Sequence, residues 1–227
     1  MTAPEAVVVG GGLAGLAAAV AVAGAGLPTL HVAPKAPPDR RTSALMLPSV
    51  DYLRTAGLVD DPAAIGHPLT QIRIIDATGR LIRAPETLFE AAEAGLPAFG
   101  WNFPNTRLAE AFEAARAGLP NLVTREATLR ELTPADGGWA LGLDDGTALT
   151  TPFLVGADGK KSFVRAAGGF RAREHGFTQA ALVCDLELGR PLGGTSVEFH
   201  YPQGPFTLVP AGDRRANLVW IDDRHVL

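Results

Sequence analysis

Three glycines near the N-terminus have the spacing of a dinucleotide-binding turn. Gly10, Gly12 and Gly15 follow a short β-branched segment, Ala6–Val9, and lead into the alanine-rich residues 13–25. In a strand–turn–helix unit, the first glycine permits a tight turn and the second lets the backbone approach a pyrophosphate. The third allows close packing of the helix on the sheet. The spacing therefore predicts a dinucleotide site, with an unliganded glycine-rich turn as the alternative.

The amides at the start of the predicted helix, at Leu13 and Ala14, are expected to bind the anion. An acidic residue at the end of the second strand usually accepts a hydrogen bond from a ribose hydroxyl. No Asp or Glu occurs between Glu5 and Asp39. The ribose contact is therefore expected from the backbone, from Asp39 if its loop folds back, or from no residue. The glycine motif alone does not separate NAD from FAD.

The segment around this motif carries no charge from residue 6 to residue 30, so a membrane span is an alternative interpretation. Against a span, the run contains six glycines and a proline, and acidic Glu5 precedes it. A buried strand–helix–strand unit also reads as a nearly continuous apolar run. We therefore expect strands at 6–9 and 29–33 with a helix at 13–25 between them.

The rest of the chain predicts a mixture of helices and strands. Helices are expected at 47–56 and 105–117, a hairpin at 71–76 and 80–83, and an antiparallel meander within 121–156 that ends in a return strand. Strand-like runs without helix then follow, at 181–188, 196–201, 206–209 and 217–221.

A second motif, FLVGADGKKSFVR, occupies residues 153–165 and again predicts a strand, a glycine turn and a short helix. An ordinary Asp-Gly turn is the alternative. Together with the N-terminal glycines, the motif resembles the Asp-Gly motif of class A flavin-dependent aromatic hydroxylases. The resemblance implies that Asp158 and Gly159 contact FAD, with Asp158 at its ribose, and that the same loop serves transient binding of NAD(P)H.

Two intervening segments continue the resemblance. RTSALMLPSVDYLRTAGL is similar to the family segment in which an arginine before a helix lies along the flavin, which suggests Arg41. A solvated loop charge is the alternative, and Arg40 competes for the role. WNFPNTRLAEAF is similar to the segment in which a polar residue and an arginine face FAD, which suggests Asn105 and Arg107. A surface helix charge is the alternative for Arg107.

The whole chain resembles the ubiquinone-biosynthesis group of these hydroxylases. The resemblance implies an α/β fold: a Rossmann-type FAD-binding domain with a β-meander at 1–168, in which residues 68–100 contribute to the substrate side, and an incomplete mainly-β substrate domain at 169–227. It implies an FAD monooxygenase that consumes NAD(P)H and dioxygen and hydroxylates a phenolic, polyprenylated ubiquinone precursor. It also implies peripheral association with the inner membrane and contact with other ubiquinone-biosynthesis proteins. The single cysteine favours a reducing, cytoplasmic compartment.

One departure concerns a later Gly-Asp motif of the family that binds the ribityl and phosphate part of FAD. The Gly212-Asp213 pair does not match it and predicts a hairpin turn, and the chain ends at Leu227 before such a motif. We therefore expect a truncated N-terminal portion. A catalytically silent dinucleotide-binding fragment and a related flavin reductase are the alternative functions.

Composition excludes several other classes. The net charge is −4 and no block of like charges occurs, which disfavours nucleic-acid binding. Cys184 is the only cysteine and the five histidines lack metal-ligand spacing, so neither a disulfide framework nor a metal site is expected. Cys184 is expected to be a buried core thiol. No catalytic side chain is predicted, because the flavin would perform the chemistry.

Overall fold

The computed structural model describes residues 4–35 and 37–227, which form two compact units. The first unit comprises the chain up to Asp39, together with Leu53–Asp60 and Leu108–Arg173. The second comprises Arg40–Tyr52, Asp61–Arg107 and Glu174–Leu227. The expected division near residue 168 stays a prediction.

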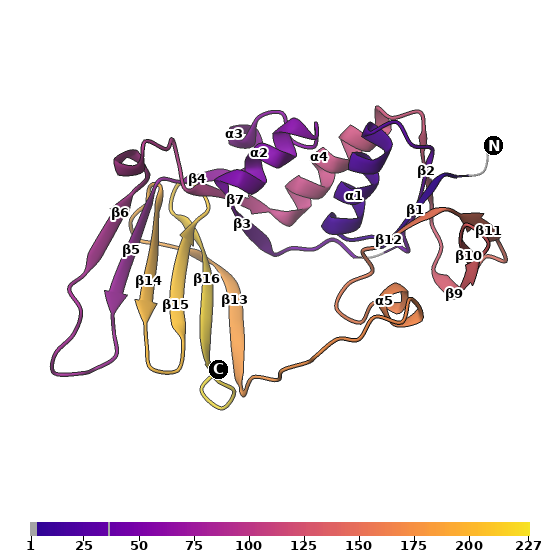
Figure 1. Cartoon of the computed structure of the whole chain (residues 1–227). Helices are drawn as coiled ribbons and strands as arrows, with labels where there is room; N and C mark the ends of the chain where they lie inside the picture. Colours follow the sequence, from indigo (N-terminus) through magenta and orange to yellow (C-terminus); the bar gives the residue numbers. More distant parts are fainter. Residues whose placement is uncertain (1–3, 36) are drawn as a thin grey trace. The chain divides into compact units, whose positions relative to one another are not determined.

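A four-stranded parallel sheet forms the centre of the first unit (Figure 1), in the order β12-β1-β2-β8. Its strands are β1 (Ala6–Val9), β2 (Thr29–Val32), β8 (Leu122–Arg125) and β12 (Phe153–Gly156). Helix α1 (Leu13–Gly24) packs against β1 and β2 and buries Leu16, Ala19, Val20 and Ala23. The strand–helix–strand unit predicted around the glycines is confirmed.

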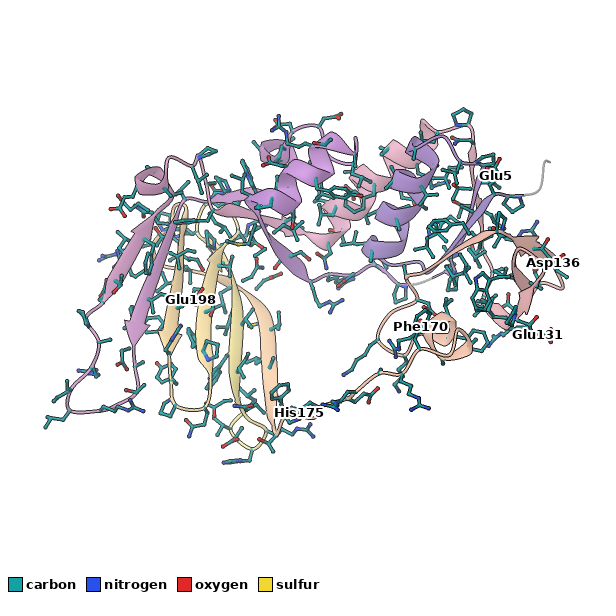
Figure 2. The ribbon with its side chains drawn as sticks, viewed as in Figure 1. Glu5, Glu131, Asp136, Phe170, His175 and Glu198 are labelled. Atoms are coloured by element: carbon teal, nitrogen blue, oxygen red, sulfur yellow. The ribbon has the colours of Figure 1, made fainter. Side chains whose placement is uncertain are left out.

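An antiparallel meander packs against the other face of this sheet. It consists of β9 (Leu129–Ala135), β10 (Gly138–Leu143) and β11 (Ala148–Thr151). Its inward leucines join the apolar side chains of β1 and β2 in one buried cluster. Figure 2 shows Glu131 and Asp136 on the meander, where both are exposed.

The meander is smaller than predicted, because β8 joins the parallel sheet instead. Thr29 donates its amide to the Asn121 carbonyl, and β8 then continues in parallel register beside β2. Leu122 becomes buried as a result. Residues 153–156 form the predicted return strand, which pairs with β1.

The predicted helices after the first strand pair are confirmed. They are α2 (Leu47–Thr55) and α4 (Asn105–Ala117), which buries Leu108 and Phe112. Two short additional helices are α3 (Pro62–Ile65) and a 3-10 turn, η1 (Ala91–Ala94). The short helix α5 (Phe163–Ala167) follows the second motif, as predicted.

The second unit is built on a six-stranded mixed sheet in the order β13-β16-β15-β14-β5-β6 (Figure 1). These strands are β5 (Gln71–Asp76), β6 (Thr87–Glu90), β13 (Gln179–Glu187), β14 (Thr195–His200), β15 (Pro205–Pro210) and β16 (Arg215–Asp223). A smaller sheet contains β3 (Thr42–Met46), β7 (Gly100–Pro104) and β4 (His67–Leu69). The α/β fold class and the four late strands are confirmed.

The predicted hairpin after β5 is wrong in its second strand. Residues 80–83 form no strand, and β6 pairs with β5 instead, with Ile74 opposite Thr87. The Asp76 carboxylate accepts hydrogen bonds from the Thr78 and Ala84 amides, at 3.0 Å each, which widens the turn into a ten-residue loop at 77–86. The hydrogen bonds to Asp76 thus favour this longer loop over the short turn expected between residues 76 and 80.

The Gly212-Asp213 pair forms the turn between β15 and β16, as predicted, with positive φ angles at both residues. Ala211 and Arg215 close the turn by backbone hydrogen bonds. In the part of the chain that the structure describes, no helix is both long and apolar enough to cross a membrane.

Candidate cofactor-binding site

The glycine turn between β1 and α1 is packed too closely for side chains at two positions. Gly10 has a φ of +136°, and a Cβ atom there would lie 2.1 Å from the Ala157 carbonyl oxygen. A Cβ atom on Gly15 would lie 1.9 Å from the Gly10 carbonyl oxygen. Both glycines are therefore required by the backbone, independently of any ligand.

Gly12 has a different environment. It is the N-cap of α1 with ordinary extended angles, and a Cβ atom there would meet no atom of the described residues within 4 Å. No side chain caps the helix, and no acidic residue lies in its first turn. The first-turn amides, which include Leu13 and Ala14, thus have no side-chain acceptor, and the space before them suits an anionic group.

The second motif places Asp158 directly after β12. Its carboxylate accepts hydrogen bonds from the Ser162 hydroxyl, from the Phe163 amide at 2.6 Å and from the Val164 amide at 3.1 Å. Ser162 in turn caps α5 by accepting from the Arg165 amide at 2.9 Å. Asp158 therefore holds its own loop together.

These contacts set the ionisation of Asp158. Partial burial raises the pKa of its carboxyl group, but hydrogen bonds from Ser162 and from nearby backbone amides outweigh that effect. The net pKa lies below the usual value. The carboxylate is therefore ionised at neutral pH, with most of its acceptor capacity used inside the loop.

The two turns line one pocket of about 400 Å³ within the first unit. It brings together Gly10, Gly12, Asp158 and Gly159 of the predicted residues, while Leu13, Ala14 and Gly15 lie in the adjoining first turn of α1. The other lining residues are Val9, Gly11, Pro34, Thr128, Leu129, Ala157, Lys161 and Phe163. Of the described residues after β2, Pro34 lines the pocket and Asp39 does not, so none of them brings a carboxylate to it.

Lys161 is a pocket residue that the sequence reasoning did not single out. It is exposed and follows Gly159 by two positions in the second motif. With the Asp158 carboxylate committed to its own loop, Lys161 contributes a cation to the wall of the pocket. The two adjacent lysines of the second motif are the sequence feature that could have indicated a cation at this site.

His31 also escaped the sequence reasoning. It lies in β2 with 2% of its surface exposed, and its Nε2 is 2.8 Å from the Gly10 carbonyl oxygen. Because a carbonyl only accepts, Nε2 carries the proton, and the buried Nδ1 has no hydrogen-bond partner among the described residues. Burial lowers the pKa of His31, and the contact with Gly10 offsets this only in part. The sequence feature that could have identified it is a histidine within an otherwise apolar strand that pairs beside the glycine turn.

The remaining predicted residues belong to the second unit. Asn105 is buried, and its side-chain Oδ1 accepts a hydrogen bond from the Ser43 hydroxyl at 2.6 Å. Its backbone N–H donates to the Arg41 backbone carbonyl at 2.9 Å. Arg107 lines a pocket of about 350 Å³ in the same unit, together with His67 and Arg215. Their roles toward a cofactor stay predictions.

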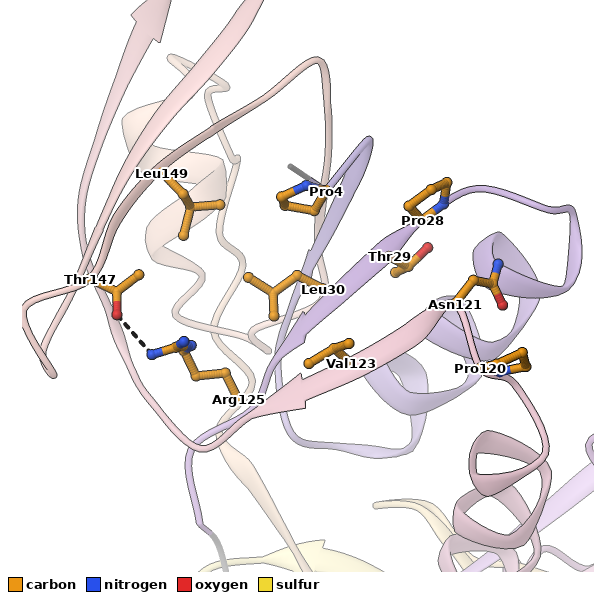
Figure 3. A pocket seen from close by; sticks show the side chains of 10 residues that line it. All are labelled: Pro4, Pro28, Thr29, Leu30, Pro120, Asn121, Val123, Arg125, Thr147 and Leu149. Carbon is orange, nitrogen blue, oxygen red and sulfur yellow. Dashed lines mark hydrogen bonds between the residues drawn. The ribbon is translucent and has the colours of Figure 1, made fainter. Parts of the chain in front are cut away.

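Another pocket of the first unit, of about 360 Å³, lies beside β8 and is mainly apolar (Figure 3). At its edge Arg125 donates a hydrogen bond to the Thr147 hydroxyl at 2.8 Å and forms an ion pair with Asp145. None of the residues predicted to bind a cofactor lines it.

Two other expectations concern metals and the cysteine. Within residues 4–35 and 37–227, no group of three or more His, Cys, Asp or Glu side chains could hold a metal ion. Cys184 is only half-buried, so its assignment to the core is wrong. It lies on β13, one of the two edge strands of the six-stranded sheet, which pairs only with β16 in the described part of the chain.

Comparison with known proteins agrees with this geometry. The family model described as "FAD binding domain" matches residues 4–222. The chain is 31% identical over 226 residues to ubiquinone hydroxylase UbiL of Rhodospirillum rubrum, covering 96% of this chain and 52% of that protein. It is 29% identical to 3-demethoxyubiquinol 3-hydroxylase of Escherichia coli, covering 96% of this chain and 57% of that protein.

Among solved structures, p-nitrophenol 4-monooxygenase PnpA from Pseudomonas putida superposes with a TM-score of 0.82 at 20% identity, over 98% of this chain and 58% of that one. The chain thus spans about half the length of the curated relatives it matches. The expected resemblance to flavin-dependent hydroxylases is confirmed. Because the family model covers nearly all of the sequence, the chain belongs to the FAD-binding domain family.

Proposed function

We propose that the first unit binds FAD and that the protein is an NAD(P)H-consuming monooxygenase that hydroxylates a phenolic ring. The observation that carries this proposal is the pocket between the glycine turn and the Asp158 turn, with Gly12 open toward it. When bound, FAD would supply the redox chemistry by which dioxygen is activated. No side chain of the pocket is required as a base or nucleophile.

The pocket residues would have different roles in binding FAD. The uncapped amides at the start of α1 would bind the pyrophosphate, and Gly12 would leave room for it. Lys161 adds positive charge at the same wall. Asp158 would act mainly by fixing the shape of its loop, including Gly159, because its oxygens already accept hydrogen bonds there. This refines the predicted contact of Asp158 with the ribose.

We propose that Arg41, Asn105 and Arg107 also contact FAD, with Arg41 along the flavin, as the family resemblance implies. Arg41 would pair with anionic oxygens or with negative charge on the reduced flavin. The hydrogen bond from the Asn105 backbone N–H to the Arg41 backbone carbonyl holds these two residues next to each other. Arg107 would contribute a second cation. These roles rest on the family resemblance and on the shared location of the three residues.

The names of the relatives support a polyprenylated ubiquinone precursor as substrate. Such a molecule resides in lipid, so we propose peripheral association with the inner face of a membrane and contact with other proteins of ubiquinone biosynthesis. The expected compartment is the cytoplasm. Conversion of candidate phenols, followed by mass spectrometry of the product, would test the substrate class.

The direct experiment is titration of the purified chain with FAD, followed by flavin fluorescence, in parallel with Gly12→Ser. Serine is a favoured N-cap, so the variant should fold at least as well as the wild type. Its hydroxyl would, however, compete for the first-turn amides and occupy the open space. We expect roughly a fivefold or larger increase in the Kd for FAD, equivalent to about 1 kcal/mol.

The outcomes separate the alternatives. FAD binding with NAD(P)H oxidation and a hydroxylated phenol supports the monooxygenase. Flavin reduction without product would favour a reductase. A folded chain that binds no FAD would favour the catalytically silent fragment. Unchanged FAD affinity in Gly12→Ser would contradict the assignment of the pyrophosphate to this pocket.

A further inference from the structure

Two aliphatic side chains stand fully in solvent at the end of the β5–β6 hairpin. Leu81 is fully exposed and Ile82 is 88% exposed, far more than the apolar residues of the neighbouring strands. Figure 1 shows their loop at the free end of the hairpin. Single exposed apolar residues are common, but two adjacent ones that are almost fully exposed leave a large apolar area in water. We call residues 80–83 the hairpin tip.

The loop that carries the hairpin tip is organised by Asp76. Its carboxylate accepts hydrogen bonds from the Thr78 hydroxyl at 2.7 Å, from the Thr78 amide and from the Ala84 amide. These bonds, led by that of the Thr78 hydroxyl, lower the pKa of Asp76 to about 2. The carboxylate therefore stays ionised at physiological pH. The base of the loop is tied to the strand end, while its apex is turned outward.

The hairpin tip is also cationic. Arg80 and Arg83 directly flank the two aliphatic residues, and arginine stays protonated at any physiological pH. The nearest acid after them, Glu86, is paired with Arg73 at 3.0 Å. Asp76 lies at the base of the loop, where it interacts with Arg80. The apex thus combines an apolar pair with positive charge on both sides.

We propose that the hairpin tip inserts Leu81 and Ile82 into the interfacial region of an anionic lipid bilayer, with Arg80 and Arg83 at the level of the headgroups. Apolar groups with flanking cations are what an anionic membrane surface attracts. A stable protein interface needs about 800 Å² on each partner, more than two side chains offer. The inference deepens the peripheral membrane association proposed above by naming the segment that makes it.

The apolar contribution is tested by co-sedimentation of the chain with vesicles of phosphatidylglycerol and phosphatidylcholine. The variant carries Leu81→Ser and Ile82→Ser. Because both residues are exposed, these changes should leave thermal unfolding nearly unchanged. We expect vesicle affinity to fall roughly tenfold or more, since the burial of two aliphatic side chains is lost.

A matched control carries Leu182→Thr and Val183→Thr on β13. These residues are also exposed, at 40% and 49%, but arginines do not flank them. Threonine is β-branched and therefore suits a strand at both positions. The control should bind vesicles like the wild type. An equal loss in both variants would show general apolar adhesion and would overturn the proposal.

The cationic contribution is tested with Arg80→Gln and Arg83→Gln. Each change should weaken binding to anionic vesicles roughly fivefold, with a smaller effect in high salt. Pure phosphatidylcholine vesicles should bind the wild type more weakly than anionic ones. The proposal would be refuted if the wild-type protein did not bind anionic vesicles, or if the serine variant bound them with the affinity of the wild type. FAD titration of the same samples is a separate readout, so failure of either proposal is recognised independently.

Discussion

The two turns that line the proposed FAD pocket are built on opposite principles. The glycine turn depends on missing side chains: its backbone segments approach so closely that Gly10 and Gly15 have no room for a Cβ atom. The Asp158 turn depends on a side chain, because one carboxylate gathers a hydroxyl and two backbone amides. A Cβ atom on Gly159 would meet nothing within 4 Å, although its φ of +87° still favours glycine.

The difference determines how each turn should respond to change. The repulsion between overlapping atoms rises steeply as they approach, so the glycine turn should tolerate almost no added side-chain volume. Hydrogen bonds to a partly exposed carboxylate are weaker and depend on pH. We therefore expect substitutions that create steric overlap to have larger effects than substitutions that remove a hydrogen bond or a charge.

Gly15→Ala should have the largest effect. The added Cβ atom would overlap the Gly10 carbonyl oxygen, so helix and turn would have to move apart. We expect a loss of at least about 3 kcal/mol in the free energy of unfolding, measured by urea denaturation. Gly24→Ala at the end of the same helix is the control, because its Cβ atom would meet nothing within 4 Å. That change should be neutral or stabilise by up to about 1 kcal/mol. Comparable losses in both would contradict the steric explanation.

His31→Leu should have the next largest effect. It removes the only side chain that we find hydrogen-bonded to the Gly10 carbonyl within the described residues, and it leaves that buried oxygen without the contact. The expected cost is about 1–3 kcal/mol, with weaker FAD binding because the turn is less well held. His31→Gln should recover part of both, since its amide can donate from a similar position.

Thr151→Val provides the control for His31. Thr151 is equally buried in the first unit and donates to the Glu5 or Phe153 carbonyl, away from the glycine turn. It should lower stability without changing the Kd for FAD measured on folded protein. If His31→Leu behaves in the same way, His31 serves the fold alone.

Asp158→Asn should have a moderate effect that depends on pH. The folded-state pKa of Asp158 lies below its usual value, so the ionised carboxylate stabilises the fold above the unfolded pKa of about 3.9. This contribution is lost as pH falls through the folded-state pKa. At pH 7 we expect the variant to lose about 1 kcal/mol, because one amide oxygen replaces two acceptors at the helix start.

Urea denaturation between pH 2 and pH 7 measures this difference, which should shrink toward the acidic end. Asp136→Asn removes the same charge from the exposed turn between β9 and β10 and is the control for net charge. A difference between Asp158→Asn and wild type that is constant over this range would contradict the proposed contribution of the carboxylate.

The features of the site that the sequence predicts are those formed by residues close together in the chain. The glycine turn was predictable because its strand, turn and helix are contiguous, and the Asp158 loop was found because its motif is local as well. The second strand of the hairpin after β5 was missed because the Asp76 carboxylate reaches eight residues along the chain to Ala84. Strand β8 was misplaced because its partner, β2, is about ninety residues earlier.

The roles of particular side chains were less predictable. No sequence pattern identifies the role of His31, because that role depends on a hydrogen bond to the Gly10 carbonyl that forms only in the folded protein. Asp158 was identified, but the sequence did not show that its acceptors would be occupied within five or six residues. Local backbone geometry is thus encoded in short motifs, whereas the partner of a polar side chain depends on the completed fold.

Lys161→Ala should have the smallest effect, and it tests whether the Asp158 turn contributes charge as well as shape. An exposed lysine near a diphosphate contributes about 0.3–1 kcal/mol, or roughly a two- to fivefold change in the Kd for FAD at low salt. Salt near 1 M shortens the screening length to about 3 Å and should remove the difference. Lys160→Ala makes the same change in net charge one residue earlier, at a side chain outside the pocket lining, and should leave the Kd nearly unchanged. Equal shifts in both variants would mean that the overall charge of the loop, and not a lysine in the pocket wall, attracts FAD.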